Sequence, residues 1–277
     1  MLVLTKVDVQ SYAGESISFP LQNVADGFIL KEVRGLDPGK ASLVSSTFAN
    51  MDGAQYQAAR FEPRNIVMLF DLEPRYSGTS VRELRNTLYR HFMPKTPLTL
   101  GFEMDDGLAV EIEGVVEAAE SPIFSSDPQF AVSVICHRPD FVDPVIKFGT
   151  GEAFSHMSYK TIEYEGSVPA GIKFILSMNA GNASNGIILQ HESPTGVVSP
   201  LTFSAPLQGL DEVSINTTPG DKSAILKRAG VESSILYGVS PQSKWFQLEP
   251  GTNKIGIQVT GSQTYWEYEW YNRYGGL

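Results

Sequence analysis

The sequence predicts a mainly β protein with two β-rich domains in series. Over most of the chain apolar side chains recur at every second position, which is the period of a strand with one face on a core. In the second half these runs are short and are separated by Gly, Pro and Asn turns, as in an antiparallel sandwich. The 277 residues suffice for two medium domains. We place the boundary in the small-residue segment 147–158 and expect domains at residues 1–148 and 153–277.

Three segments of the first half show the strand period most clearly. Residues 64–72 and 129–137 carry apolar side chains on both faces of the predicted strand, so we expect both faces to be largely covered. Residues 108–120 alternate aliphatic side chains with Glu, which is typical of a strand with one face in water. All three are predicted strands of the first domain.

Segment 79–94 has helical spacing instead. Its apolar side chains recur at intervals of three and four residues, namely Val81, Leu84, Leu88 and Phe92. Ser80 followed by Glu83 is a capping box, and Pro94 stops the run. The pattern predicts one amphipathic helix of about three turns, whose apolar stripe packs on the end or side of the first domain.

Side chains that could perform chemistry do not form a recognisable motif. The four His residues are not at metal-ligand spacing, and the single cysteine, Cys136, excludes an internal disulfide. Cys136 and His137 are neighbours on a predicted strand, so their side chains point to opposite faces, which disfavours a nucleophile and its base. We expect no metal, no cofactor and no enzymatic activity. A sugar hydrolase with carboxylates far apart in the sequence is a further hypothesis that no motif supports.

The charge balance argues against binding to nucleic acid. The formal net charge is -10, and a phosphate backbone is bound chiefly through clusters of Lys and Arg. Arg82, Arg85 and Arg90 lie along the predicted helix, and we interpret them as a solvated or ion-paired helix face. No run approaches the roughly 18 apolar residues of a membrane helix. The first residues alternate like a strand and do not resemble a secretory signal.

The aromatic segment 264–277 allows two interpretations. Trp266, Tyr268 and Trp270 share one face of a predicted strand, while Glu267 and Glu269 lie on the other. Tryptophan and tyrosine side chains form platforms for sugars and partner proteins, but they also fill the core beneath a closing strand. Because the opposite face is acidic, we favour the core interpretation.

A long hairpin is expected around Asp52 and Gly53, because an Asp-Gly pair favours a tight two-residue turn. The two halves of the hairpin mix apolar side chains with Ser, Asn and Gln, which suits a ribbon that is covered only after assembly. An isolated two-stranded hairpin is marginally stable in water. The hairpin therefore needs a partner surface.

The order of several short motifs resembles the siphophage distal tail proteins over nearly the whole chain. In the first half the marks are Gly35-Leu36, Asp52-Gly53 with Tyr56, Arg64-Asn65-Ile66, Arg85 with Leu88 and Tyr89, Ile112 with Val115 and Glu117, and Pro139-Asp140-Phe141. In the second half they are Trp245, Leu248, Pro250, Gly251 and Asn253, followed by the tyrosine-rich end "YNRYGGL".

The resemblance implies a fold and a role. The fold is an N-terminal β-sandwich-like domain with one α-helix and a long hairpin arm, followed by a galectin-like antiparallel β-sandwich. The role is structural: six copies form a ring at the distal end of a phage tail, within the virion, after synthesis in the host cytoplasm. The partners are other copies, the tail tube protein, a tail-tip or tail-associated protein, and receptor-binding or other baseplate proteins.

The resemblance also assigns the hairpin, residues 43–64, to the contact with the neighbouring copy in the ring. The interface residues that it implies are Leu43, Val44, Phe48, Met51, Asp52, Gly53, Tyr56 and Phe61. The alternative is a carbohydrate-binding module that attaches to host glycans. Its platform would consist of Trp245, Trp266 and Trp270.

Overall fold

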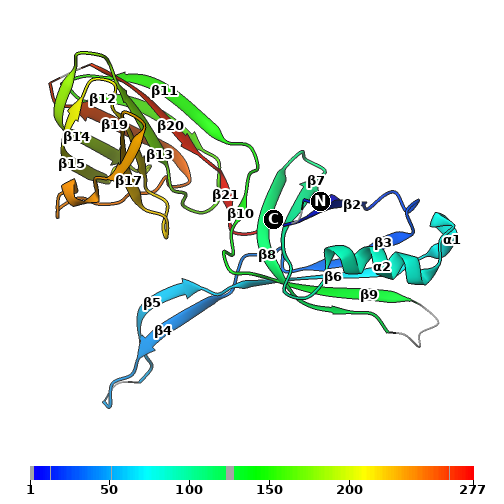
Figure 1. Cartoon of the computed structure of the whole chain (residues 1–277). Helices are drawn as coiled ribbons and strands as arrows, with labels where there is room; N and C mark the ends of the chain where they lie inside the picture. The colour runs from blue at the N-terminus through cyan, green and yellow to red at the C-terminus, as the bar shows by residue number, and fades with distance from the viewer. Residues whose placement is uncertain (1–2, 13, 51, 123–127, 262) are drawn as a thin grey trace. The chain divides into compact units, whose positions relative to one another are not determined.

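The computed structural model describes residues 3–12, 14–50, 52–122, 128–261 and 263–277. In these residues the chain is mainly β, as predicted (Figure 1). It divides into two compact units, Met1–Pro144 together with Tyr274–Leu277, and Val145–Arg273. The last four residues of the sequence therefore belong to the first unit.

The first unit contains one large antiparallel sheet with the strand order β2, β1, β7, β8, β9, β6, β3. Its strands are Leu4–Ser11 (β1), Ser16–Pro20 (β2), Phe28–Arg34 (β3), Arg64–Leu72 (β6), Pro97–Met104 (β7), Ala109–Glu120 (β8) and Gln129–Cys136 (β9). The short strand Phe141–Val142 (β10) pairs with β8.

One face of this sheet carries the core of the first unit. Along β6 every second side chain is buried, and β9 repeats the pattern beside it. The opposite faces of both strands are half-buried apart from the exposed Asn65, whereas Glu111 and Glu113 of β8 are exposed. The period of two predicted these alternations, and it holds because one face of each strand packs on the core.

The helix also forms as predicted. Helix α2 (Val81–His91) begins with the Ser80–Glu83 capping box and buries Leu84 and Leu88. Phe92, at its C-cap, lies 6.1 Å from both Phe70 and Phe130 between ring centroids. The apolar stripe is therefore part of the core. A single helical turn, α1 (Pro74–Ser77), precedes it.

The second unit consists of two antiparallel sheets that share one core. The first has the order β11, β20, β13, β16, β17, β18, and the second has the order β12, β19, β14, β15. The strands are Lys147–Ala153 (β11), Ser158–Tyr164 (β12), Lys173–Met178 (β13), Ala183–Glu192 (β14), Val198–Gln208 (β15), Glu212–Asn216 (β16), Ser223–Arg228 (β17), Val231–Ser234 (β18), Gly251–Val259 (β19) and Thr264–Trp270 (β20). A 3-10 turn (η1, Leu236–Gly238) follows β18, and the short strand β21 (Arg273–Tyr274) pairs with β10.

The segment that we expected to separate the domains contains a strand. Residues 147–153 form β11, which pairs with β20 over its whole length. Its two glycines lie opposite Tyr268 and Trp266, and a methyl group on Gly149 would lie 2.3 Å from the Tyr268 ring. The small residues that interrupt the strand pattern are thus places where aromatic rings cover the backbone.

Candidate assembly interface

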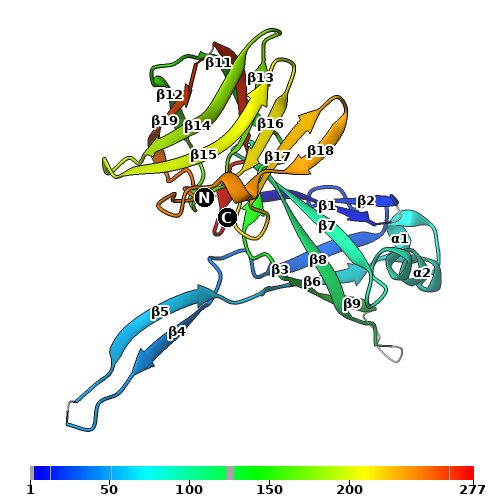
Figure 2. The ribbon, with the colours of Figure 1, turned by 60° about the vertical axis from the view of Figure 1, so that its left-hand side comes forward.

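The hairpin arm is a two-stranded ribbon made of β4 (Ala41–Ser46) and β5 (Gln55–Phe61). In both views of the ribbon it extends away from the sheet of the first unit (Figures 1 and 2). Antiparallel pairing runs from Ala41 opposite Phe61 to Ser46 opposite Gln55, with a bulge after Val44.

The turn of the arm is longer than predicted. Pairing ends at Ser46 and Gln55, so residues 47–54 connect the strands, and the prediction of a tight two-residue turn at Asp52-Gly53 is wrong. Asn, Asp and Gly are depleted in strands, and the connection contains Asn50, Asp52 and Gly53. Gly53 adopts the left-handed φ of +91° that glycine tolerates. Met51, a predicted interface residue, lies outside the described residues.

The arm exposes apolar side chains on both of its faces. Leu43 and Phe61 share one face with Tyr56, which pairs with Ser45 beyond the bulge, and Val44 lies on the other face. The exposed fractions are 69% for Leu43, 51% for Val44, 53% for Phe48, 63% for Tyr56 and 58% for Phe61. Asp52 and Gly53 are exposed as well. The remaining predicted interface residues thus lie together on one projecting element.

Few interactions within the ribbon support it. Besides the strand hydrogen bonds, the Gln57 amide nitrogen donates to the Ser46 hydroxyl over 2.9 Å. A two-stranded hairpin without further cover is marginal in water, and its unpaired outer edges are ready to bind other chains. The arm as it stands is a surface that gains stability when another surface covers it.

The base of the arm is held by Arg64, which sequence reasoning used only as a motif residue. Its buried guanidinium donates to the carbonyl oxygens of Pro139 and Gly35, each over 2.7 Å, and to those of Asp37 and Gly275. The same group lies 4.5 Å from the centroid of the Phe141 ring. Burial lowers the pKa of Arg64 from its usual value, and the carbonyls compensate for the lost water. A signal existed in the sequence, because Arg64 has the same strand parity as the buried Ile66.

The predicted glycan platform does not form as a surface. Trp266 is fully buried and stacks 6.2 Å from Phe174 in the core of the second unit. Trp245 and Trp270 pack against the same core and are partly buried. The acidic opposite face indicated this outcome, and the Trp266 indole cannot contact a sugar ring in this fold.

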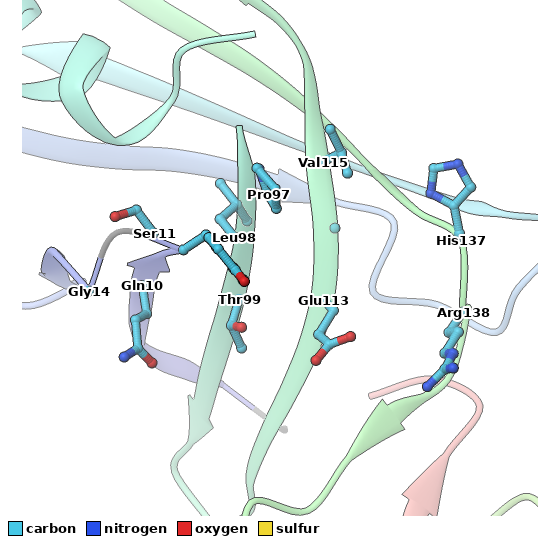
Figure 3. Close-up of a pocket in the computed structure, with 12 residues that line it drawn as sticks. Gln10, Ser11, Gly14, Pro97, Leu98, Thr99, Glu113, Val115, His137 and Arg138 are labelled. Carbon is cyan, nitrogen blue, oxygen red and sulfur yellow. The ribbon is translucent and has the colours of Figure 1, made fainter. Parts of the chain in front are cut away.

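The first unit also has a hollow on the outer face of its sheet, with a volume of about 630 Å³ (Figure 3). Gln10, Thr99 and Glu113 come from the neighbouring strands β1, β7 and β8, and His137 and Arg138 follow β9. The side chains that line it do not include a nucleophile paired with a base. The described residues contain no group of three His, Cys, Asp or Glu that could hold a metal ion.

Cys136 and His137 diverge as predicted. The thiol is buried in the core of the first unit, and burial raises its pKa to about 11, whereas the His137 side chain is exposed. The thiol stays protonated and unreactive at neutral pH. Across the described part of the chain, no helix has the length and apolarity that crossing a membrane requires.

Comparison with known proteins gives a result only for the fold. No protein-family model matches the sequence, and no curated protein matches it. Among solved structures, SPP1 Dit, described as a paradigm of the hub adsorption apparatus in Gram-positive infecting phages, covers 96% of this chain and 98% of its own. The TM-score is 0.67 and the sequence identity 15%. The chain has the fold of a phage distal tail protein.

The likeness predicted from the order of the motifs is thereby confirmed for the fold. A chain from the phage P2 baseplate, in its activated conformation with Ca, is similar over 99% of this chain and 100% of its own. Its TM-score is 0.48 and its sequence identity 9%. At these identities the likeness shows the fold alone.

Proposed function

We propose that this protein is a structural component of a phage tail tip, in which six copies form a ring that connects the tail tube to the adsorption apparatus. The observation that carries the proposal is the arm, a projecting ribbon with exposed apolar side chains on both faces. Support comes from the shared fold with SPP1 Dit, a hub protein.

The arm suits a ring because it belongs to one copy and needs cover from another. If the arm of each copy docks on a different surface of the next, the contact is heterologous, and such contacts close into a ring when the rotation per copy fits. Leu43, Tyr56 and Phe61 would pack against the neighbour from one face, and Val44 would remain available on the other. The first unit then forms the ring and the second unit offers attachment surfaces for baseplate or receptor-binding proteins.

Deletion of residues 46–58 tests the role of the arm. Because β4 and β5 form a sheet of their own, the deletion should leave the rest of the first unit folded, with an unchanged thermal midpoint. We expect sedimentation velocity to show rings for the full chain at high concentration and single copies for the deleted chain.

A matched pair of substitutions separates the arm from exposed aromatics in general. Tyr56→Ser removes an exposed ring from the arm, and Tyr237→Ser removes one from η1 in the second unit. Tyr56→Ser should weaken assembly by about tenfold or more, the size of effect that aromatic anchors have at interfaces, and Tyr237→Ser should not. Rings of unchanged size from the arm-deleted chain would refute the proposal.

A further inference from the structure

The carbonyl groups around Arg64 come from three segments that are far apart in the sequence. Gly35 and Asp37 belong to the loop between β3 and β4, Pro139 follows β9, and Gly275 belongs to the last residues of the sequence. One side chain thus joins the loop that leads into the arm to a segment more than two hundred positions later.

The segment 274–277 makes further contacts with the same loop. The Leu277 amide donates to the Leu36 carbonyl over 3.0 Å. Gly276 lies so close to Pro38 that a methyl group on it would be 2.6 Å from the Pro38 nitrogen. The side chains of Tyr274 and Leu277 pack against the core of the first unit. The segment is therefore held at both its backbone and its side chains.

Both stems of the arm meet at this place. The loop 35–40 leads directly into β4, and β5 ends at Phe61, three residues before Arg64. The Glu62 amide donates to the Lys40 carbonyl over 2.9 Å, which closes the base of the ribbon. A methyl group on Gly39 would lie 3.7 Å from both the Arg64 guanidinium and the Phe61 ring.

We propose that Arg64 and residues 274–277 form a latch that sets the direction in which the arm leaves the first unit. The link to ring assembly rests on the function proposed above, but the latch itself does not. A planar guanidinium with several donors can hold carbonyls from three segments at fixed angles, whereas a lysine ammonium cannot span them in the same way. The residues of the latch are positioning residues for the interface.

The direction of the arm can be measured without assembly. The substitutions Ser45→Cys, in β4, and Glu113→Cys, in β8, provide two exposed sites for spin labels, while the buried Cys136 stays unlabelled. In dilute full-length protein, pulsed electron resonance should give one narrow distance distribution. Arg64→Lys, and separately a chain ending at Arg273, should broaden it, whereas Arg75→Lys on the exposed turn α1 should not.

Hydrogen exchange in the same variants provides the second readout. We expect the Glu62 amide, which donates to the Lys40 carbonyl, to exchange about tenfold faster or more, because the base of the arm opens more often once the latch is lost. If Arg64→Lys fails to fold, the chain ending at Arg273 still tests the latch because it retains Arg64.

Unchanged distances and unchanged exchange in the shortened chain would overturn the latch. The proposed function is refuted by a different result, namely rings that still form after deletion of residues 46–58. A broadened distribution with faster exchange at the base of the arm supports the latch whatever the assembly state of the protein.

Discussion

Single buried polar residues fix this fold at places where the strand pattern alone would not. Arg64 occupies a core-facing position at the start of β6 and holds loops by their carbonyls. Asn253 acts similarly in the second unit, where its buried side chain accepts from the Glu249 amide over 2.9 Å and donates to the Gly251 carbonyl over 2.8 Å. The motif around Pro250 is therefore a turn that the Asn253 side chain holds in place.

Such roles are hard to predict from sequence, because they depend on partners far along the chain. Arg64 lies two positions before Ile66 on the same strand, which indicates that its side chain faces the core. The neighbouring sequence does not predict that the carbonyls of Pro139 and Gly275 accept its hydrogen bonds. The burial of Trp266 was easier to predict, since its alternation with glutamates distinguishes the two faces of one strand.

Asp211 provides a pH-dependent test in the second unit. Its buried carboxylate accepts from Arg228 through Nε over 2.8 Å and Nη2 over 2.7 Å, and from the Gln208 amide over 2.7 Å. The hydrogen bonds from Arg228 lower the pKa of Asp211 below its usual value. Since the folded pKa is lowered, this stabilisation is present above about pH 4. It is lost as the pH falls through the folded pKa.

We expect Asp211→Asn to lower the free energy of unfolding of the second unit by about 2 kcal/mol at pH 7, as for lost charged hydrogen bonds. The penalty should shrink as the pH falls below about 4. Urea unfolding at pH 7 and pH 3 checks this. Glu212→Gln, at the neighbouring but exposed ion pair with Lys227, whose charged atoms lie 3.9 Å apart, is the matched control. An equal penalty at both pH values would contradict the assignment.

At the scale of elements, strong periodicity was the reliable guide. Helix α2 and strands β6, β8 and β9 lie where their patterns predicted, because each buries one face or stripe on a core. Strand β11 escaped prediction because Gly149 and Gly151 carry no side chain to mark a face. The turn of the arm was mispredicted because pairing stops before the Asp-Gly pair.

The account of β11 predicts that Gly149→Ala destabilises the second unit. The added methyl group would lie 2.3 Å from the Tyr268 ring, and Tyr268 is itself buried beside Trp266. We expect a loss of about 1–3 kcal/mol, as for overpacked cores. Thermal unfolding measures it, with Thr150→Ala, on the opposite face of the same strand, as the control. An unchanged or raised midpoint for Gly149→Ala would show that the Tyr268 side chain does not need the space above Gly149.

At the scale of the whole molecule, we propose that the arm makes copies of this chain assemble. The formal net charge of -10 on each copy opposes association, and salt screens that repulsion. Assembly driven by the apolar side chains of the arm should therefore be favoured at moderate ionic strength. The partners that such a ring would join cannot be predicted from the chain, because their surfaces are complementary to the assembled ring.

The most direct test is negative-stain electron microscopy of the concentrated full-length protein at about physiological ionic strength, where the Debye length is about 8 Å. The account predicts rings with six-fold symmetry and a central hole, and their absence after deletion of residues 46–58. Particles that stay single at every concentration and ionic strength, or rings that persist without the arm, would contradict it.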